Sequence, residues 1–533
     1  MKSSLFGRRY ALCAGAIIAL VILASSWAAP LAAQEQFGRS AASIEAAKAP
    51  AVAARRARLM DILEDAVIII PSQYQSRGEM RDNLNFLYLT GLQEADAVLV
   101  LDPGGKPRET IFRRATGGSR GRGAAAGGAG STGGMISASG AAGMGAQQAA
   151  VRPGARGDQR AGQATAQGAD QSGPSPNPGI VEKPTTELAS SLRGLVMSGR
   201  AERVYLPFSA MDFLDRAFAA SNLPNPLARS DAILNLDPTL AEMRLTKDEV
   251  EIAALREAID LTAEALNEAY RAAEPGVREV DLAAILRYFF NRRETTDSFL
   301  QAASGPNSTS VHFGATTRPL ASGDIVVFDV GCWIRGYTSD ISRTIPANGR
   351  FTREQREIYA LVLEAQKAGC AKLVPGVTFK AVQTEVEDIL MAGLEKLGLV
   401  TDVKSPWQRR LHIQHGFGHG IGLEVHDVWS WHSPRLDEVE MVPGMVMTME
   451  PGLYFPEVRF EAFMDGLKGR VPDAEIAAFR AKVGPVYKKY AGIGVRIEDD
   501  VLITKGGNEM QSGGVPKEIA EIEKLMREKS RFD

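Results

Sequence analysis

Residues 324–346 read DIVVFDVGCWIRGYTSDISRTIP, a stretch that predicts two adjacent β-strands joined by a tight turn. Alternation along the first strand places Val327 and Asp329 on one face, with Asp329 ending the row. A hairpin at residues 334–337 follows, and Asp340 comes eleven residues after Asp329. The two carboxylates therefore converge, and carboxylate oxygens suit divalent cations. Taken alone, acids that cap a turn or form ion pairs explain this pattern better than a metal site does.

A second segment, QHGFGHGIGLEVHD at residues 414–427, holds three of the six histidines of the chain. Its four glycines remove side-chain bulk and allow the backbone to approach an ion or a ligand closely. A single histidine in such a place is more commonly structural. Three within twelve positions predict a functional cluster instead.

Two further strands each carry an acid. Residues 443–454, PGMVMTMEPGLY, form a strand that ends at Glu450, before the turn at Pro451 and Gly452. Residues 494–503, GVRIEDDVLI, alternate so that Arg496 and Glu498 share a face, for which a simple ion pair is the alternative explanation. Together the segments supply four carboxylates and an imidazole. One metal ion does not need so many anions, so the pattern favours two ions a few ångströms apart.

Composition limits the classes of partner. The 533 residues are 45% hydrophobic and carry a net charge of −3, which supports two or three domains and gives no electrostatic basis for binding nucleic acid or an anionic membrane. Residues 1–33 resemble a signal peptide, because Lys2, Arg8 and Arg9 precede an apolar run. We therefore expect a protein exported to the periplasm or secreted, with no membrane partner after cleavage. An uncleaved leader would make it membrane-anchored.

The N-terminal domain is expected at residues 50–240, with an α/β pattern. Its predicted elements are a helix at 53–63, strands at 66–70, 85–89, 97–101 and 203–206, and helices at 188–196 and 210–220. Residues 116–179 are rich in Gly, Ala, Ser, Gln and Arg and nearly free of large apolar side chains. This composition predicts a disordered insertion that interrupts the domain.

The second unit is expected at residues 246–525, with an α+β pattern and a curved antiparallel sheet. It begins at Thr246, where Thr-Lys-Asp-Glu predicts a capping box ahead of an amphipathic helix. Long helices are predicted at 353–373 and 379–397, between short β segments separated by Gly and Pro turns.

With these segments in hand, the chain resembles the creatinase/aminopeptidase P type of metallopeptidase, the pita-bread fold, and within it the Xaa-Pro aminopeptidases and prolidases. The likeness covers residues 246–510 and, more weakly, 53–112, where DNLNFLYLTG at 82–91 resembles a strand motif of the family's N-terminal domain. Three features depart from the family pattern: the Gly-rich insertion, the long segment at 457–490, and the prolidase-like His-Gly-Ile-Gly at 419–422.

The resemblance implies roles for ten residues. The implied metal ligands are Asp329, Asp340, His419, Glu450 and Glu498. The implied catalytic residues are His312, His426 and Glu450, and the implied substrate-binding residues are His415, Arg435 and Arg496. For His312 the simpler alternative is core packing, and for Arg435 it is an ordinary surface arginine.

The implied activity is removal of the N-terminal residue from peptides with proline in second position. Two divalent metal ions would serve as cofactors, with Mn²⁺ expected and Co²⁺ or Zn²⁺ chemically acceptable. One alternative is a prolidase that acts on Xaa-Pro dipeptides. Another is a non-catalytic peptide-binding module of the same fold, although such modules lose ligands and every ligand position here keeps a competent residue. Family members commonly dimerise, so a homodimer is expected.

Overall fold

The structure, a computed structural model, describes residues 48–76, 79–114, 179–208, 230–429 and 438–532, together with Met211, Asp215 and Leu227. The predicted leader, residues 116–178 of the predicted insertion, most of the predicted helix at 210–220, and Arg435 lie outside the described residues. Among the helices in the described ranges, none has both the length and the apolar character that a membrane crossing requires.

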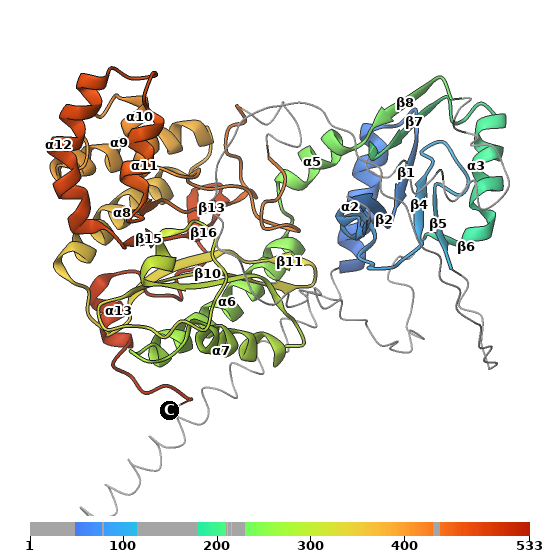
Figure 1. The fold of residues 1–533 in the computed structure, drawn as a ribbon. Helices are drawn as coiled ribbons and strands as arrows, with labels where there is room; N and C mark the ends of the chain where they lie inside the picture. The colour runs from blue at the N-terminus through green and yellow to red at the C-terminus, as the bar shows by residue number, and fades with distance from the viewer. Residues whose placement is uncertain are drawn as a thin grey trace, which may run out of the picture. The chain divides into compact units, whose positions relative to one another are not determined.

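A six-stranded mixed sheet forms the core of the N-terminal part, in the order β6-β5-β4-β1-β7-β8 (Figure 1). The strands are β1 (Val67–Pro71), β4 (Val98–Leu101), β5 (Glu109–Arg113), β6 (Val181–Pro184), β7 (Arg203–Leu206) and β8 (Ala232–Asn235). Alternate residues of β1 enter two separate apolar clusters, Ile68 and Ile70 one, Val67 and Ile69 the other. The apolar run of β1 is therefore explained by burial on both faces.

Helices and a hairpin complete this part. A helix covers residues 48–62, and η1 (Thr185–Glu187) leads into α3 (Leu188–Met197). A separate hairpin pairs β2 (Gln73–Ser76) with β3 (Glu79–Asp82). The predicted helices at 53–63 and 188–196 and the predicted strands at 66–70, 97–101 and 203–206 are confirmed within a few residues.

The predicted strand at 85–89 is wrong, because this segment is helix α2 (Leu84–Thr90). The side chain of Asn83 accepts the Asn85 N–H at 3.0 Å and caps the first turn. Gly91 adopts a left-handed conformation and donates its N–H to the Leu87 carbonyl, which closes the last turn. Local capping therefore decides the conformation of a short apolar run that is compatible with either structure.

Helix α5 (Asp237–Leu245) leads into α6 (Glu249–Ala272), the first long helix of the C-terminal part. The capping box of α6 uses Asp248 and Glu251, whereas the sequence suggested that it begins at Thr246. Asp248 takes the cap because its carboxylate accepts two backbone N–H groups at 3.0 Å while Glu251 accepts the Asp248 N–H.

Antiparallel strands carry the C-terminal part. One sheet contains β9 (Asp297–Ser304), β10 (Ile325–Ile334), β11 (Tyr337–Thr338) and β12 (Ile341–Pro346). A second contains β13 (Val446–Met449), β16 (Asp499–Thr504) and β17 (Gly507–Met510), and a third pairs β14 (Gly452–Tyr454) with β15 (Gly494–Arg496). The N–H of Glu498 donates to the Ser342 carbonyl at 2.9 Å and links the segment between β15 and β16 to β12.

Helices cover these strands. Figure 1 shows α6 and α7 (Glu279–Asn291) side by side below β10, while α8 (Arg353–Lys372) pairs with α9 (Phe379–Lys396) and contacts β13, β14 and β15. The two predicted long helices are thus confirmed. The remaining elements are η4 (Gly305–Thr309), α10 (Pro406–His412), α11 (Arg459–Gly466), α12 (Asp473–Tyr490) and α13 (Ile519–Leu525).

The long segment at 457–490 supplies α11 and α12. Arg459 donates to the carbonyls of Arg410 and Leu411 at the end of α10, both at 3.1 Å, and the Tyr490 hydroxyl bonds Glu357 of α8. This addition therefore thickens the helical layer.

Candidate active site

One cavity of about 800 Å³ collects the predicted site residues. Nine of the ten line it, and the tenth, Arg435, lies outside the described residues. The nine are His312, Asp329, Asp340, His415, His419, His426, Glu450, Arg496 and Glu498.

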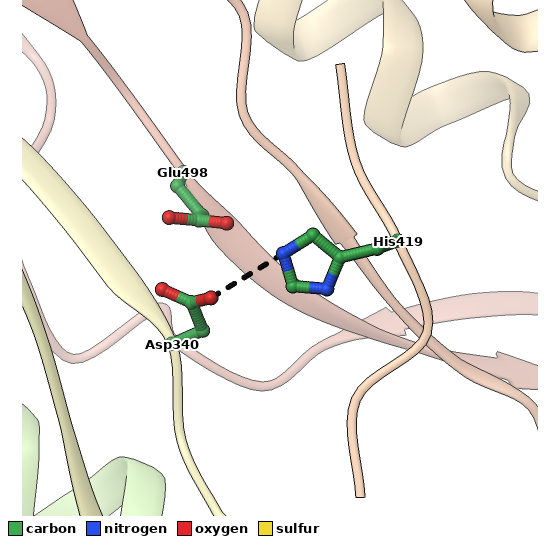
Figure 2. Close-up of side chains that lie close together, drawn as sticks. All are labelled: Asp340, His419 and Glu498. Atoms are coloured by element: carbon green, nitrogen blue, oxygen red, sulfur yellow. Dashed lines mark ion pairs between the residues drawn. The ribbon is translucent and has the colours of Figure 1, made fainter. Parts of the chain in front are cut away.

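The closest group in this cavity comprises Asp340, His419 and Glu498, whose potential ligand atoms all lie within 4.8 Å of one another. Figure 2 shows the three side chains pointing toward a common centre from separate segments of the chain. The Nε2 atom of His419 lies 3.4 Å from Oδ2 of Asp340 and 3.5 Å from Oε1 of Glu450. Four segments that are far apart in sequence thus converge on one point.

Strand register positions the two aspartates. Asp329 of β10 lies opposite Ser342 of β12, and Asp340 is two residues before Ser342, so the three side chains share one face of the sheet. The sequence suggested that Asp329 ends its strand, but β10 continues five residues further. The strand continues because its pairing with β9 runs on past the aspartate, with a register shift between Gly331 and Cys332, and its last two residues pair with β11.

The His-Gly segment lies directly against β13. His419 donates its N–H to Oγ1 of Thr448 at 3.1 Å, and the Thr448 N–H donates to the His419 carbonyl at 2.8 Å. Gly418 has a φ of 155°, and a Cβ there would lie 2.2 Å from the Thr448 carbonyl oxygen. Only glycine permits this approach, which brings His419 to the acids.

Ser342 and Arg496 form a buried hub behind the acids. The Ser342 hydroxyl lies 2.7 Å from Oδ1 of Asp329 and 2.8 Å from Oε2 of Glu498, and it accepts the Nε–H of Arg496 at 2.8 Å. The Arg496 guanidinium also pairs with Asp329 and donates to the Val311 carbonyl and the Tyr454 hydroxyl. Every nitrogen of the Arg496 guanidinium is therefore engaged.

The carboxylates disturb one another strongly. Burial, followed by the charge of Glu498, raises the pKa of Asp340 and that of Glu450 well above their usual values. Burial and the charge of Asp329 raise the pKa of Glu498 to about 7. Oδ1 of Asp340 and Oε1 of Glu498 are buried without a hydrogen-bond partner. Crowded, partnerless carboxylate oxygens beside an imidazole fit divalent cations, which would supply the missing positive charge.

His419 is prepared to act as a neutral ligand. Its Nδ1 lies 3.1 Å from the Gly420 carbonyl oxygen, which accepts a hydrogen bond only if Nδ1 carries the proton. The Nε2 lone pair then faces the acids. Burial and the neighbouring His426 lower the pKa of His419 to about 3.

Three other histidines, His312, His415 and His426, line the cavity around this centre. The rings of His426 and His419 lie 4.2 Å apart, and burial together with His312 lowers the pKa of His426. His415 lies 3.0 Å from the Tyr454 hydroxyl through Nε2 and 3.7 Å from Oε2 of Glu450 through Nδ1. Burial, followed by Arg496, lowers the pKa of His415 to about 3. His312 is exposed at the cavity wall, not packed in the core.

Several residues of the site had not been identified from the sequence. Tyr74, Asp82 and Leu84 of the N-terminal part line the same cavity. Asp82 and Leu84 belong to the segment 82–91 that resembles a family motif, but its pattern does not assign them to the site, because packing between distant segments places them there. Ser342 could have been found, since it alternates with Asp340 along the strand that follows the hairpin.

Comparisons with known proteins agree with this geometry. The model of metallopeptidase family M24 matches residues 253–505, and that of the aminopeptidase P N-terminal domain matches residues 52–119. The Xaa-Pro aminopeptidase of Haemophilus influenzae is 38% identical over 302 residues, 55% of this chain and 64% of the relative. That of Escherichia coli is 38% identical over 295 residues, 54% of this chain and 61% of the relative. The chain thus aligns with less than two thirds of these relatives' lengths.

Solved structures extend the likeness over most of the chain. The Pseudomonas aeruginosa aminopeptidase PepP has a TM-score of 0.64 at 29% identity, covering 89% of this chain and 97% of its own. Escherichia coli aminopeptidase P with the inhibitor Pro-Leu has a TM-score of 0.65 at 29% identity, covering 90% of this chain and 98% of its own.

A dipeptidase is also among the sequence relatives. A mouse Xaa-Pro dipeptidase is 30% identical over 313 residues, 55% of this chain and 62% of the relative.

Proposed function

Because the chain belongs to metallopeptidase family M24 and carries an aminopeptidase P N-terminal domain, we propose that it is a metallo-exopeptidase that removes the N-terminal residue from peptides with proline in second position. The predicted family and the predicted pita-bread fold, preceded by a smaller α/β domain, are confirmed. The convergence of Asp340, His419 and Glu498 in one cavity carries the proposal.

The metal content is part of the proposal. We propose that Asp329, Asp340, His419, Glu450 and Glu498 hold two divalent ions, with Mn²⁺ first and Co²⁺ or Zn²⁺ chemically acceptable. When bound, such ions polarise a peptide carbonyl and activate water. The crowding of acids around partnerless oxygens supports this assignment.

The chain's own groups supply the remaining chemistry. Glu450 lines the cavity beside His419 and His415, so its carboxylate is placed to carry a proton to the leaving nitrogen of proline. His426 has a lowered pKa, so the neutral imidazole can donate an N–H to the reacting carbonyl oxygen. Arg496 and Ser342 hold Asp329 in place.

The dipeptidase alternative makes a specific demand on the cavity. A Xaa-Pro dipeptide places its carboxylate directly after proline and requires a cation there. Among the described residues that line the cavity, Arg496 is the only arginine or lysine, and its guanidinium is engaged by Asp329, Ser342, Val311 and Tyr454. This observation favours substrates longer than two residues. If the protein is a prolidase instead, Arg435 is the residue proposed to bind the dipeptide carboxylate.

The non-catalytic alternative is weaker. A peptide-binding module has no need of four carboxylates in one cavity, and their mutual repulsion would only destabilise it. Export and homodimer formation remain predictions. Export is supported by the leader-like sequence at residues 1–33, which lies outside the described residues.

One experiment tests the activity and its alternatives. Cleavage of a Xaa-Pro-Xaa tripeptide and of the matching Xaa-Pro dipeptide is measured before chelation, after chelation and after return of Mn²⁺, Co²⁺ or Zn²⁺. We expect metal-dependent cleavage with the tripeptide preferred. Preference for the dipeptide supports a prolidase, and absence of cleavage with every ion refutes the peptidase assignment.

A further inference from the structure

A cluster of buried charges lies behind the His-Gly segment and contains none of the implied metal ligands. Nη2 of Arg244 lies 2.5 Å from Oδ1 of Asp427, and Nζ of Lys247 lies 3.0 Å from Oδ2 of the same carboxylate. The three side chains are at most 6% exposed. Both cations come from the connection between the N-terminal part and α6, whereas Asp427 immediately follows His426.

The two cations fix the Asp427 carboxylate from both sides. Burial alone would raise its pKa, but Arg244 and Lys247 lower it below the usual value. A buried carboxylate that is charged and bonded at each oxygen has little freedom to move, because each displacement breaks a charge-assisted hydrogen bond.

Backbone contacts carry this restraint to the histidines. The N–H of Asp427 donates to the Gly420 carbonyl at 2.9 Å, which closes residues 419–427 into a loop, and the Thr338 N–H donates to the Gly422 carbonyl at 3.0 Å. A Cβ on Gly422 would lie 2.2 Å from Oδ2 of Asp427 and 3.0 Å from Cε of Lys247. The loop backbone therefore packs directly on the ion pair, and His426, the residue before Asp427, lines the cavity.

Arg244 also reaches the other wall of the cavity. Its Nη1 donates to Oδ1 of Asn85 in α2 at 2.9 Å, and Nη2 lies 3.6 Å from Oε2 of Glu424. Glu424 lines the cavity, as does Leu84, the neighbour of Asn85. One guanidinium thus touches the N-terminal wall, an acid of the cavity, and the residue that follows His426.

We infer that Arg244 and Lys247 are positioning residues that act through Asp427, holding the 419–427 loop so that His426 faces the reacting carbonyl group. The effect on catalysis rests on the proposed peptidase function. The effect on the loop does not. His419 has its own anchor in Thr448, so the inference separates the position of His426 from metal binding.

The test is a double-mutant cycle with D427N and H426A. If Asp427 acts through His426, D427N lowers kcat about 10- to 100-fold in the wild-type background, in the range found for groups that orient a site residue. In the H426A background the same change lowers kcat less than about twofold, because the group it positions is gone. Bound metal and KM stay within about twofold of the wild-type values.

A purely structural role predicts equal losses in both backgrounds, and that result overturns the inference. The matched control is E109Q, which weakens the pair at 2.9 Å between the buried Arg56 of the helix at 48–62 and the partly buried Glu109 of β5. It lowers the melting temperature without changing kcat. If D427N does not fold, R244K takes its place in the cycle, since it keeps the charge and removes the contact to Asn85.

A second measurement does not depend on activity. Hydrogen exchange of the Asp427 and Thr338 amides is expected to be faster in D427N or R244K than in the wild type and unchanged in E109Q. Unchanged exchange of these amides overturns the inference. An inactive wild type with faster loop exchange in the variants refutes the proposed function and leaves the positioning role supported.

Discussion

Glu498→Gln is expected to make the metal-free protein more stable at neutral and alkaline pH while weakening metal binding. Burial and Asp329 raise the pKa of Glu498 from 4.5 to about 7 in the folded protein. At about 1.4 kcal/mol per pKa unit, this shift corresponds to about 3 kcal/mol of destabilisation when the group must be charged. The amide is never charged, so the variant avoids that penalty.

The direction in which stability changes with pH follows from proton binding. Between pH 4.5 and about 7, the folded protein holds a proton on Glu498 that the unfolded chain has already lost. The wild type therefore loses stability as the pH rises through this window, and the loss is complete above the folded pKa. The raised pKa values of Asp340 and Glu450 act in the same direction.

The assay is urea unfolding of chelated protein at pH 5 and pH 8, followed by tryptophan fluorescence. The free energy of unfolding of E498Q is expected to exceed that of the wild type by about 3 kcal/mol at pH 8 and by much less at pH 5. With Mn²⁺ added, the order is expected to reverse, because bound metal stabilises only the folded state.

Asp499, the residue after Glu498, provides a control in which loss of the charge should lower the free energy of unfolding. Burial would raise the pKa of Asp499, but Arg343 and Lys517 lower it well below the usual value. D499N is therefore expected to destabilise the chelated protein at pH 8. If E498Q proves less stable than the wild type without metal at pH 8, the repulsion that we assign to this cavity is absent and the argument fails.

Three other perturbations follow from the site. S342A removes the hydroxyl that accepts from Arg496 and is expected to weaken metal binding about 10- to 100-fold in calorimetric titration. S342T keeps the hydroxyl and is expected to bind metal more tightly than S342A; equal affinities of the two variants would show that the Ser342 hydroxyl does not hold the acids in place. H426A should lower kcat about 100-fold in steady-state kinetics with bound metal unchanged, and a change in KM alone would exclude its role at the carbonyl. G418A places a methyl group 2.2 Å from the Thr448 carbonyl oxygen; chelated G418A should melt well below the wild type, and an equal melting temperature would show that the segment can shift without strain.

The sequence predicts the sheet of the C-terminal part well because its strands obey simple alternation. Residues 324–346 give β10, the turn and β12 where the pattern places them. The capping box of α6 was displaced by two residues because Thr246 and Asp248 are both competent caps. Asp248 is the observed cap, and its side chain also accepts a hydrogen bond from Nε of Arg55, which is distant in sequence, at 2.9 Å. The choice between two local signals was thus made by tertiary contacts.

The candidate site, like the fold, was predicted from the sequence only in part. The resemblance supplied the five implied ligands, and the structure gathers all five around one cavity. The resemblance covered Asp82 in the segment 82–91 but did not place it, or Tyr74, in the cavity, because packing between distant segments brings them there. The pairing of Asp427 with Arg244 was also missed, since it joins residues 183 positions apart. Contacts between distant segments leave no periodic pattern in a single sequence.

Two groups of buried acids in the C-terminal part differ in their partners, and the contrast argues for a cation. Asp427 and Asp499 are charged and paired with arginine and lysine. Asp340 and Glu498, at similar depth, each keep an oxygen without a hydrogen-bond partner, as does Asp500, which borders them and accepts the Asp340 N–H. The fold neutralises Asp427 and Asp499 with its own cations, yet it leaves one oxygen of Asp340 and one of Glu498 without a partner beside the His419 imidazole. Their unfavourable pKa values are explained if the missing partner is a metal ion.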